Sequence, residues 1–384
     1  MMFATVAFSI DSMLPALPSI AAELSPTDIN RAQLILTSFV LGMGIGTFVM
    51  GPLSDAFGRK PVIIFSATIY CLAAVACWFA PSLNTLLIAR LIGGFGAAGP
   101  RVVSLAVVRD LYRGRDMARI MSFAMMIFAV VPAAAPLIGS FIIHVSGWRG
   151  VFLAFICFAL IGASWMGLRQ PETLPPAARI PLSPVRLWAS LREVLSNRIV
   201  VTSIAVQSMT YACMFATISS VHSIFDVTFG RAESFPYWFM LIALVSATSS
   251  FINAALVGRL GMRFMIRTTL IAQFAVSVLV VMVWLSGVLH DNVMFAVFVF
   301  WMLSVFLGVG LSLGNLNALA MEPVGHIAGF AASAVGAIAT VISVALAAPI
   351  GLAFDGTPLP LIISQAVLIG IGLCLMLTMP PASK

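Results

Sequence analysis

The stretch Gly51-Pro-Leu-Ser-Asp-Ala-Phe-Gly-Arg-Lys60 is a ten-residue polar segment between two long apolar runs, residues 32–50 and 61–80. Each run is long enough to cross the ~30 Å hydrocarbon core of a bilayer as a helix. Gly51 and Gly58 allow backbone conformations that are closed to other residues. The segment is therefore predicted to be a tight turn that connects two membrane-spanning helices.

The charges of this turn have two interpretations. Asp55, Arg59 and Lys60 can pair with one another or with nearby helix ends. Alternatively, the turn is a solvated loop, and its positive charges only set the orientation of the chain in the membrane.

The composition excludes a soluble protein. Of the 384 residues, 61% are hydrophobic and only 9% are charged, with a mean hydropathy of +1.11. If the turn is cytoplasmic, most of the 20 lysines and arginines fall in cytoplasmic segments. This is the positive-inside pattern, and it explains the net charge of +7 without a nucleic-acid partner.

The sequence contains no recognisable catalytic or metal-binding motif. No nucleophile triad, paired-carboxylate site, phosphate loop or metal cluster is seen, so neither an enzyme nor a cofactor or metal is expected. The five cysteines lie in apolar runs without metal-ligand spacing and are interpreted as small core residues without disulfides. They are Cys71, Cys77, Cys157, Cys213 and Cys374.

The apolar runs define the predicted fold, an all-α integral membrane protein with twelve transmembrane helices in two six-helix pseudo-symmetric halves. An even number of spans places both termini on the same, cytoplasmic side. The first run lacks a basic start and a cleavage site, so it is expected to be a retained helix. The runs lie near residues 3–22, 32–50, 61–80, 84–108, 117–143, 148–168, 199–222, 234–257, 264–287, 292–320, 327–354 and 358–379.

One long hydrophilic segment divides these runs six and six. The predicted organisation is an N-terminal half (1–168), a cytoplasmic linker (169–198) and a C-terminal half (199–384), with a substrate site at the midplane between the halves. Residues 182–195 of the linker have an amphipathic pattern that suits a helix on the inner membrane face.

The two halves repeat one charge pattern. A degenerate copy of the turn, carrying Arg259 and Arg263, lies between the eighth and ninth runs. Repeat geometry predicts that Asp110 lies near Arg59, and that Glu322 lies near Arg259 or Arg263. For Glu322, simple capping of a helix end explains the charge equally well.

Three charges lie inside predicted spans: Asp11, Arg90 and Arg101. Each costs at least ~2.5 kcal/mol at the bilayer centre and so needs a reason to be there. Asp11 lies beside two prolines that break the first helix and free backbone carbonyls. In such a setting it is a candidate proton carrier or substrate ligand, or else a structural acid paired with an arginine.

Arg90 and Arg101 are eleven residues apart, about three helical turns, and so share one face of the fourth helix. Gly94, Ala97 and Ala98 lie on or near that face, which suits close helix approach or a cavity wall. An arginine can tune a neighbouring carboxylate or hold an anionic substrate group. Arg101 is predicted to be either a substrate contact or part of a structural ion pair.

Weaker candidates lie in other spans. Pro132, Pro136 and Gly139 are predicted to kink the fifth helix and let it approach a neighbour. Polar side chains within spans usually face the interior of the bundle, where they line a cavity or hydrogen-bond between helices. Those selected as candidate substrate contacts are Gln207, Tyr211, Asn253 and Asn315.

The chain resembles the major facilitator superfamily over its whole length, and within it the bicyclomycin and chloramphenicol resistance group of twelve-helix drug/proton antiporters. Four stretches carry the resemblance, residues 11–18, 51–60, 108–112 and 318–333. The resemblance implies a monomeric transporter of the bacterial inner membrane with lipid and a small-molecule substrate as its partners.

The resemblance also implies residue roles. Asp11 is similar to an acid that takes part in proton or substrate binding, and Arg90 to an arginine linked to proton coupling. Pro136 and Gly139 resemble a fifth-helix antiporter signature, although Val131, Ala135 and Ser140 stand where glycines are common. The opening turn resembles a cytoplasmic latch between the halves, here expected to involve Gly51, Asp55, Gly58, Arg59, Asp110, Arg259 and Glu322.

The expected function is proton-coupled efflux of small organic compounds by alternating access, with protons as the coupling ion. Relatives have a small residue where this chain has Arg101. Because of this arginine, an alternative function is import of a small anionic metabolite. A membrane sensor on the same fold is a third interpretation, although no signalling domain is visible.

Overall fold

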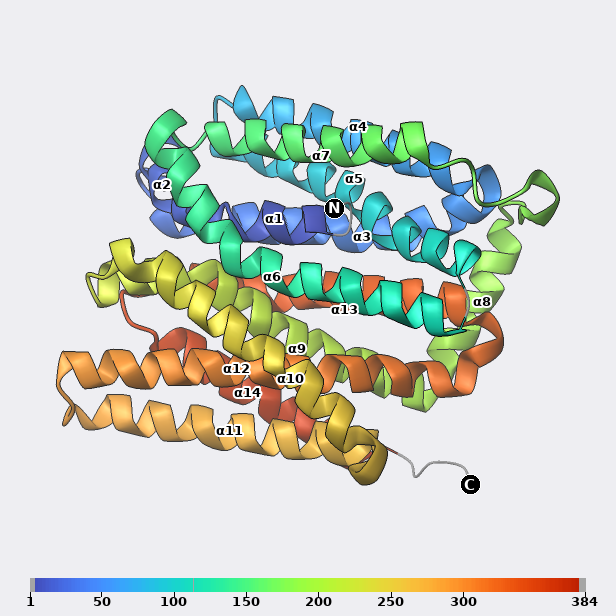
Figure 1. The fold of residues 1–384 in the computed structure, drawn as a ribbon. Coiled ribbons are helices and arrows are strands. Elements are labelled where there is room, and N and C mark those ends of the chain that lie inside the picture. The colour runs from blue at the N-terminus through green and yellow to red at the C-terminus, as the bar shows by residue number, and fades with distance from the viewer. Residues whose placement is uncertain (1–3, 113, 380–384) are drawn as a thin grey trace. The chain divides into compact units, whose positions relative to one another are not determined.

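The computed structural model describes residues 4–112 and 114–379, and within them the chain is helical without any strand (Figure 1). It forms two compact units, Met1–Leu191 and Arg192–Lys384. The first unit contains α1 (Thr5–Asp11), α2 (Leu17–Leu24), α3 (Leu34–Phe57), α4 (Arg59–Trp78), α5 (Leu83–Leu111), α6 (Gly114–Ser146) and α7 (Gly150–Arg169). After α8 (Pro184–Ser196), which crosses the boundary, the second unit contains α9 (Arg198–Ser223), α10 (Phe235–Leu260), α11 (Met262–Ser286), α12 (Asp291–Met321), α13 (Ala328–Leu352) and α14 (Leu359–Leu377).

The predicted apolar runs coincide with helices. Among the described residues, ten stretches are long and apolar enough to cross a membrane, and one of them, residues 291–352, contains both α12 and α13. A shorter apolar stretch, Val130–Ser146, forms the second part of α6. The chain is therefore an all-α, multi-pass membrane protein. The first residue of the predicted first span, Phe3, lies outside the described part.

The turn predicted at residues 51–60 is much shorter than expected. Helix α3 continues through Pro52 to Phe57, and α4 begins at Arg59, so Gly58 alone breaks the helices. Gly58 has a φ of 105°, a conformation that side chains disfavour. A helix satisfies its own backbone hydrogen bonds, so polar residues beyond the apolar run remain helical until a residue with positive φ ends it.

The predicted break in the first helix is present. Helix α1 ends at Asp11, a short 3₁₀ turn follows at Leu14–Ala16, and α2 starts at Leu17. Pro15 and Pro18 lie in the first turns of the two later segments. The N–H groups of a first turn have no acceptor within the helix, so a proline there removes no helical hydrogen bond.

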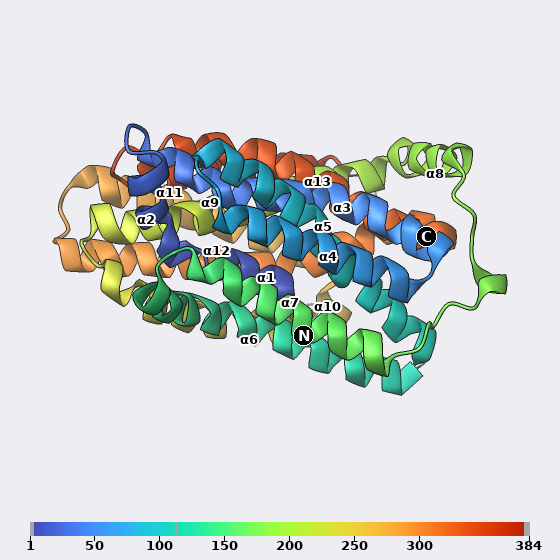
Figure 2. The same ribbon diagram turned by 90° about the horizontal axis from the view of Figure 1, so that it is seen from above.

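Helix α5 packs closely against two neighbours, as Figure 2 shows for α3, α4 and α5. A Cβ at Gly94 would collide with the carbonyl of Phe39 in α3, and one at Gly96 would lie 2.7 Å from the backbone nitrogen of Tyr70 in α4. The small residues of α5 therefore serve close helix approach, one of the two roles predicted for this strip.

In the second unit, α9 packs against α12, α13 and α14. One core cluster also includes Val194 of α8, which anchors the end of that helix to this unit. Elsewhere α8 carries exposed apolar side chains, with Val185 80% and Trp188 68% exposed. This matches the amphipathic pattern predicted for the linker.

The five cysteines are free thiols. Cys77 and Cys213 are buried and Cys71 is half-buried, but Cys157 and Cys374 are exposed. The expectation that all five are core residues is wrong for these last two. An apolar run does not distinguish a lipid-exposed helix face from a buried one, because both are apolar.

Candidate functional site

Asp11 is the last residue of α1 and is 5% exposed. Within the described residues its carboxylate makes no hydrogen bond and no ion pair. In this structure Asp11 is therefore not a structural acid paired with an arginine.

Helix α6 holds the backbone beside Asp11. A Cβ at Gly139 would collide with the carbonyl oxygen of Ser12, the residue after Asp11. Two backbones thus meet where the first helix breaks. Pro132 and Pro136 lie within the same helix, which continues to Ser146.

Arg90 reaches the same segment from α5. Its Nη2 donates to the carbonyl oxygen of Ser9 at 3.0 Å, and its guanidinium lies 4.2 Å from the centroid of the Phe39 ring. The Ser9 hydroxyl in turn hydrogen-bonds the Tyr70 hydroxyl. The arginine that was expected to tune Asp11 therefore contacts the backbone two residues before it, not its carboxylate.

Arg101 lies on the same face of α5 as Arg90, as the eleven-residue spacing predicts. Arg90 Nε lies 3.5 Å from the carbonyl of Ile35, and Arg101 Nη1 lies 3.5 Å from the sulfur of Met43, both in α3. Arg101 is half-buried. Among the described residues it forms no ion pair, so its guanidinium keeps most of its hydrogen-bonding capacity.

The polar candidates of the second unit differ in their surroundings. Asn315 Nδ2 donates to Asn253 Oδ1 at 2.6 Å, which is a bond between α12 and α10. Tyr211 stacks on Phe215 with 5.8 Å between ring centroids. Gln207 is buried, and its Oε1 has no hydrogen-bond partner. The asparagines are thus explained by helix association, and Gln207 is the candidate with unused capacity.

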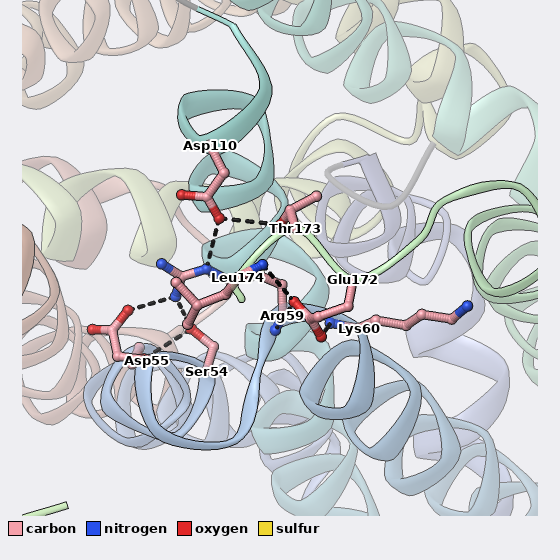
Figure 3. Close-up of polar contacts among 9 residues, drawn as sticks. Ser54, Asp55, Arg59, Lys60, Asp110, Glu172, Thr173 and Leu174 are labelled. Atoms are coloured by element: carbon pink, nitrogen blue, oxygen red, sulfur yellow. Dashed lines mark hydrogen bonds and ion pairs between the residues drawn. The ribbon is translucent and has the colours of Figure 1, made fainter. Parts of the chain in front are cut away.

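The opening turn forms an ion-pair cluster around Arg59 (Figure 3). The Arg59 side chain is 10% exposed and donates to Asp55, to Ser54 Oγ at 2.8 Å and to Asp110 Oδ2 at 3.1 Å. The predicted pairing of Asp110 with Arg59 is present. It joins the end of α5 to the start of α4.

Glu172, which follows α7, completes this cluster and was missed in the sequence. Its Oε1 accepts the backbone N–H of Arg59 at 2.9 Å, and its Oε2 accepts that of Lys60 at 3.1 Å (Figure 3). These are donors that the first turn of α4 leaves unpaired, so a carboxylate from a distant segment caps that helix. A Cβ at Gly58 would lie 2.6 Å from Glu172 Oε2, so glycine is needed for room as well as for its positive φ.

The surroundings of Glu172 stabilise its charge. Partial burial raises the pKa of the carboxyl, but hydrogen bonds from the backbone N–H groups of Leu174, Arg59 and Lys60 outweigh it and lower the pKa. Thr173 also donates to Asp110 Oδ2 at 3.1 Å. The segment after α7 is thereby attached to both α4 and α5.

The second unit does not repeat this cluster. Gly261, with a φ of 82°, separates α10 from α11 as Gly58 separates α3 from α4. However, Arg259 and Glu322 are both exposed, and among the described residues they form no ion pair with each other, so the predicted pairing of Glu322 with Arg259 is wrong. The alternative pairing with Arg263 stays a prediction. Glu193 Oε1 of α8 lies 2.8 Å from His326 Nε2. The segment Glu322–Ile327 is a 3₁₀ helix, so α12 ends before Glu322.

The family model described as Major Facilitator Superfamily matches residues 1–348. The chain belongs to the major facilitator superfamily. The break in α1 and the cluster at the α3–α4 turn thus belong to a member of a family of transporters.

Relatives within the superfamily include resistance proteins. The chain is 30% identical to an uncharacterized MFS-type transporter YdgK of Bacillus subtilis, over 85% of this chain and 81% of that protein. It is 27% identical to a bicyclomycin resistance protein homolog of Haemophilus influenzae, over 86% and 82%. The fold is shared with the xylose transporter XylE of Escherichia coli, with a TM-score of 0.72, 12% identity and coverage of 99% and 96%.

Proposed function

We propose that this protein exports small organic compounds in exchange for protons by alternating access. Membership of the major facilitator superfamily and the similarity to a bicyclomycin resistance protein homolog support this direction of transport. Protons serve as the coupling ion, and neither an organic cofactor nor a metal takes part.

The observation that carries the proposal is the buried Asp11 carboxylate, which has no cationic partner among the described residues. An unpaired charge in such a place is costly, so the carboxyl favours a proton or a bound cationic or polar group. The two ligands then exclude each other at one carboxyl. This exclusion is the requirement for exchange, since binding of one releases the other.

The neighbours of Asp11 have supporting roles in this proposal. Arg90 fixes the backbone at Ser9, two residues before Asp11. Arg101, with donors to spare, contacts polar or anionic parts of the substrate. Further substrate contacts are proposed for Gln207 and Tyr211, whereas Asn253 and Asn315 bond to each other.

The cluster around Arg59 is proposed to act as the cytoplasmic latch. It joins the end of α3, the start of α4 and the end of α5, so motion of any of these elements must break charged hydrogen bonds. The proposed latch residues are Gly51, Asp55, Gly58, Arg59 and Asp110, with Glu172 added from the structure. In this scheme both termini are cytoplasmic and the protein is a monomer in the bacterial inner membrane.

Transport in everted membrane vesicles tests the proposal. An imposed pH gradient, acidic inside, is expected to drive accumulation of bicyclomycin or a similar small compound by the wild type. Asp11→Asn is expected to remove the response to the gradient, whereas Asp28→Asn, at an exposed aspartate, is expected to keep it. Accumulation that ignores the gradient in the wild type would contradict proton coupling.

The half-buried Arg101 without an ion-pair partner favours a second candidate, an importer of a small anionic metabolite. The direction of flux separates the two. In an importer, substrate and protons move the same way, and Arg101→Ala abolishes transport of anions. In the exporter they move in opposite directions.

A further inference from the structure

A groove without polar lining runs between α11 and α14 in the second unit. Its volume is about 510 Å³, and its walls include Phe274, Val278 and Met282 of α11 and Ile363, Gly370 and Cys374 of α14. Several of these side chains are exposed, Met282 by 55% and Ile363 by 45%. Both helices are long and apolar enough to cross a membrane, so the groove faces the hydrocarbon.

Two arginines bind the end of α14, next to one end of this groove. Arg267 Nη2 donates to the carbonyl oxygen of Met376 at 3.1 Å, and Arg198 Nη2 donates to that of Thr378 at 3.3 Å. Both acceptors lie at the end of α14, within four residues of the groove residue Cys374. A pair of cations thus lies at the mouth of an apolar channel.

Arg267 and the groove residues of α11 lie on the same face of that helix. Phe274 is seven residues from Arg267, and Val281 is fourteen, so all three share one helix face. Arg267 and Phe274 are about 10 Å apart along the helix axis. A molecule that lies in the groove therefore extends directly toward the guanidinium groups.

The length of the groove indicates what kind of molecule it binds. From Ile363 to Cys374 it follows α14 for about 16 Å, about half of the ~30 Å hydrocarbon core and hence the depth of one leaflet. A spanning helix of a partner protein would need a surface along the whole core. An acyl chain needs one leaflet only, and its headgroup then lies at the membrane surface beside the arginines.

Capping of α14 is a role that the arginines already fill, because cations stabilise the carboxyl end of a helix. Each guanidinium has five N–H donors, and the contacts with α14 use one of them in each arginine. Capping also gives no reason for an apolar groove that continues from the same point. A lipid accounts for both features, since its phosphate binds the unused N–H donors and its acyl chain fills the groove.

We propose that the groove between α11 and α14, with Arg198 and Arg267 at its end, binds one anionic phospholipid. One acyl chain lies against Phe274 and Gly370, and the phosphate accepts hydrogen bonds from the two guanidinium groups. This site is separate from Asp11 and does not depend on which substrate the transporter carries.

Native mass spectrometry of the detergent-solubilised protein tests the site. The full chain is mixed with equal amounts of dioleoyl phosphatidylglycerol and dioleoyl phosphatidylcholine. Both lipids carry the phosphate, but only phosphatidylglycerol has a net negative charge, because the choline cation neutralises the other headgroup. Each arginine near an anionic headgroup contributes about 1 kcal/mol, so the wild type is expected to prefer phosphatidylglycerol by about 25-fold. Arg198→Gln and Arg267→Gln are each expected to lower the preference about fivefold, and Arg267→Lys is expected to keep it.

A second variant addresses the groove itself. Ala366 lines it, so Ala366→Leu fills it without removing charge and is expected to lower retention of both lipids. The matched controls are Ala296→Leu on an exposed face of α12 and Arg192→Gln on α8, and both are expected to bind as the wild type does. If Arg267→Gln does not fold, Arg198→Gln and Ala366→Leu still test the proposed lipid site.

Three results would overturn the proposal. Equal retention of the two lipids by the wild type would remove the role of the arginines. Unchanged retention in Ala366→Leu would place the lipid elsewhere. Displacement of phosphatidylglycerol by the same concentration of glycerol 3-phosphate would show a site for a soluble phosphate and not for a lipid.

Discussion

The guanidinium of Arg90 is bound to the backbone of the first helix and not to its carboxylate, since Nη2 donates to the carbonyl of Ser9 at 3.0 Å. Asp11 lies only two residues further along the chain and has no cationic partner within the described residues. The buried cation and the buried acid are thus neighbours without being a pair. This arrangement leaves the acid without a cationic partner in the described part of the chain, as the proposed proton exchange requires.

Replacing Arg90 is expected to separate function from stability. Arg90→Met removes a buried cation that has a carbonyl and the Phe39 ring as neighbours, and losing a buried charge without an ionic partner costs little. The unfolding temperature is expected to stay within about 4 °C of that of the wild type. Proton-coupled transport is expected to be lost. A drop in both stability and transport would indicate a purely structural role for Arg90.

Gly139→Ala is expected to destabilise the protein by about 1–3 kcal/mol, because the added methyl group collides with the Ser12 carbonyl and the two backbones must separate. Thermal unfolding measures the effect, and transport is expected to fall with it. Gly336→Ala in α13 is the control, since a Cβ there meets nothing within 4 Å and alanine favours the helix. Equal unfolding temperatures of the two variants would contradict a close contact between α6 and the first helix.

Glu172→Ala is expected to leave the first N–H groups of α4 without their acceptor. Loss of a helix cap costs about 0.5–2 kcal/mol, so the unfolding temperature should fall and the segment after α7 should become more sensitive to proteolysis. Glu233→Ala, at an exposed glutamate of the second unit, is expected to change neither. Unchanged proteolysis in Glu172→Ala would mean that other contacts hold this segment.

The contribution of Glu172 is also expected to depend on pH in one direction. Its pKa is lowered in the folded protein, so its stabilisation is fully present above the ordinary glutamate pKa of about 4.3 and is lost as the pH falls through the folded value. The difference in unfolding temperature between the wild type and Glu172→Gln should therefore be constant from about pH 6 to about pH 8 and shrink in acid. A difference that changes near neutral pH would assign the titration to another group.

The sequence was sufficient for features that depend on local chemistry or on simple repeat geometry. Apolar length predicted the helices, and the prolines at positions 15 and 18 predicted the break after Asp11. The eleven-residue spacing placed Arg90 and Arg101 on one face. Position in the repeat brought Asp110 to Arg59.

The rest depended on tertiary contacts that leave little local signal. Glu172 is one of two acidic residues in the linker, and only the folded chain brings it to α4 from more than a hundred residues away. The single-residue break at Gly58 could not be read from a run of ten polar residues, because polar residues also form helix ends. The 3₁₀ segment that begins at Glu322 also has no counterpart in the repeat pattern of the sequence.

Proton release from the purified, detergent-solubilised protein tests the central claim most directly. Neutral, cationic and anionic compounds, bicyclomycin among them, are added to the wild type, Asp11→Asn, Arg101→Ala and the control Asp28→Asn. The account predicts that the wild type and Asp28→Asn release protons on binding, that Asp11→Asn releases none, and that Arg101→Ala loses the responses to anions. Binding with undiminished proton release in Asp11→Asn, or with no release in the wild type, would contradict exchange at Asp11.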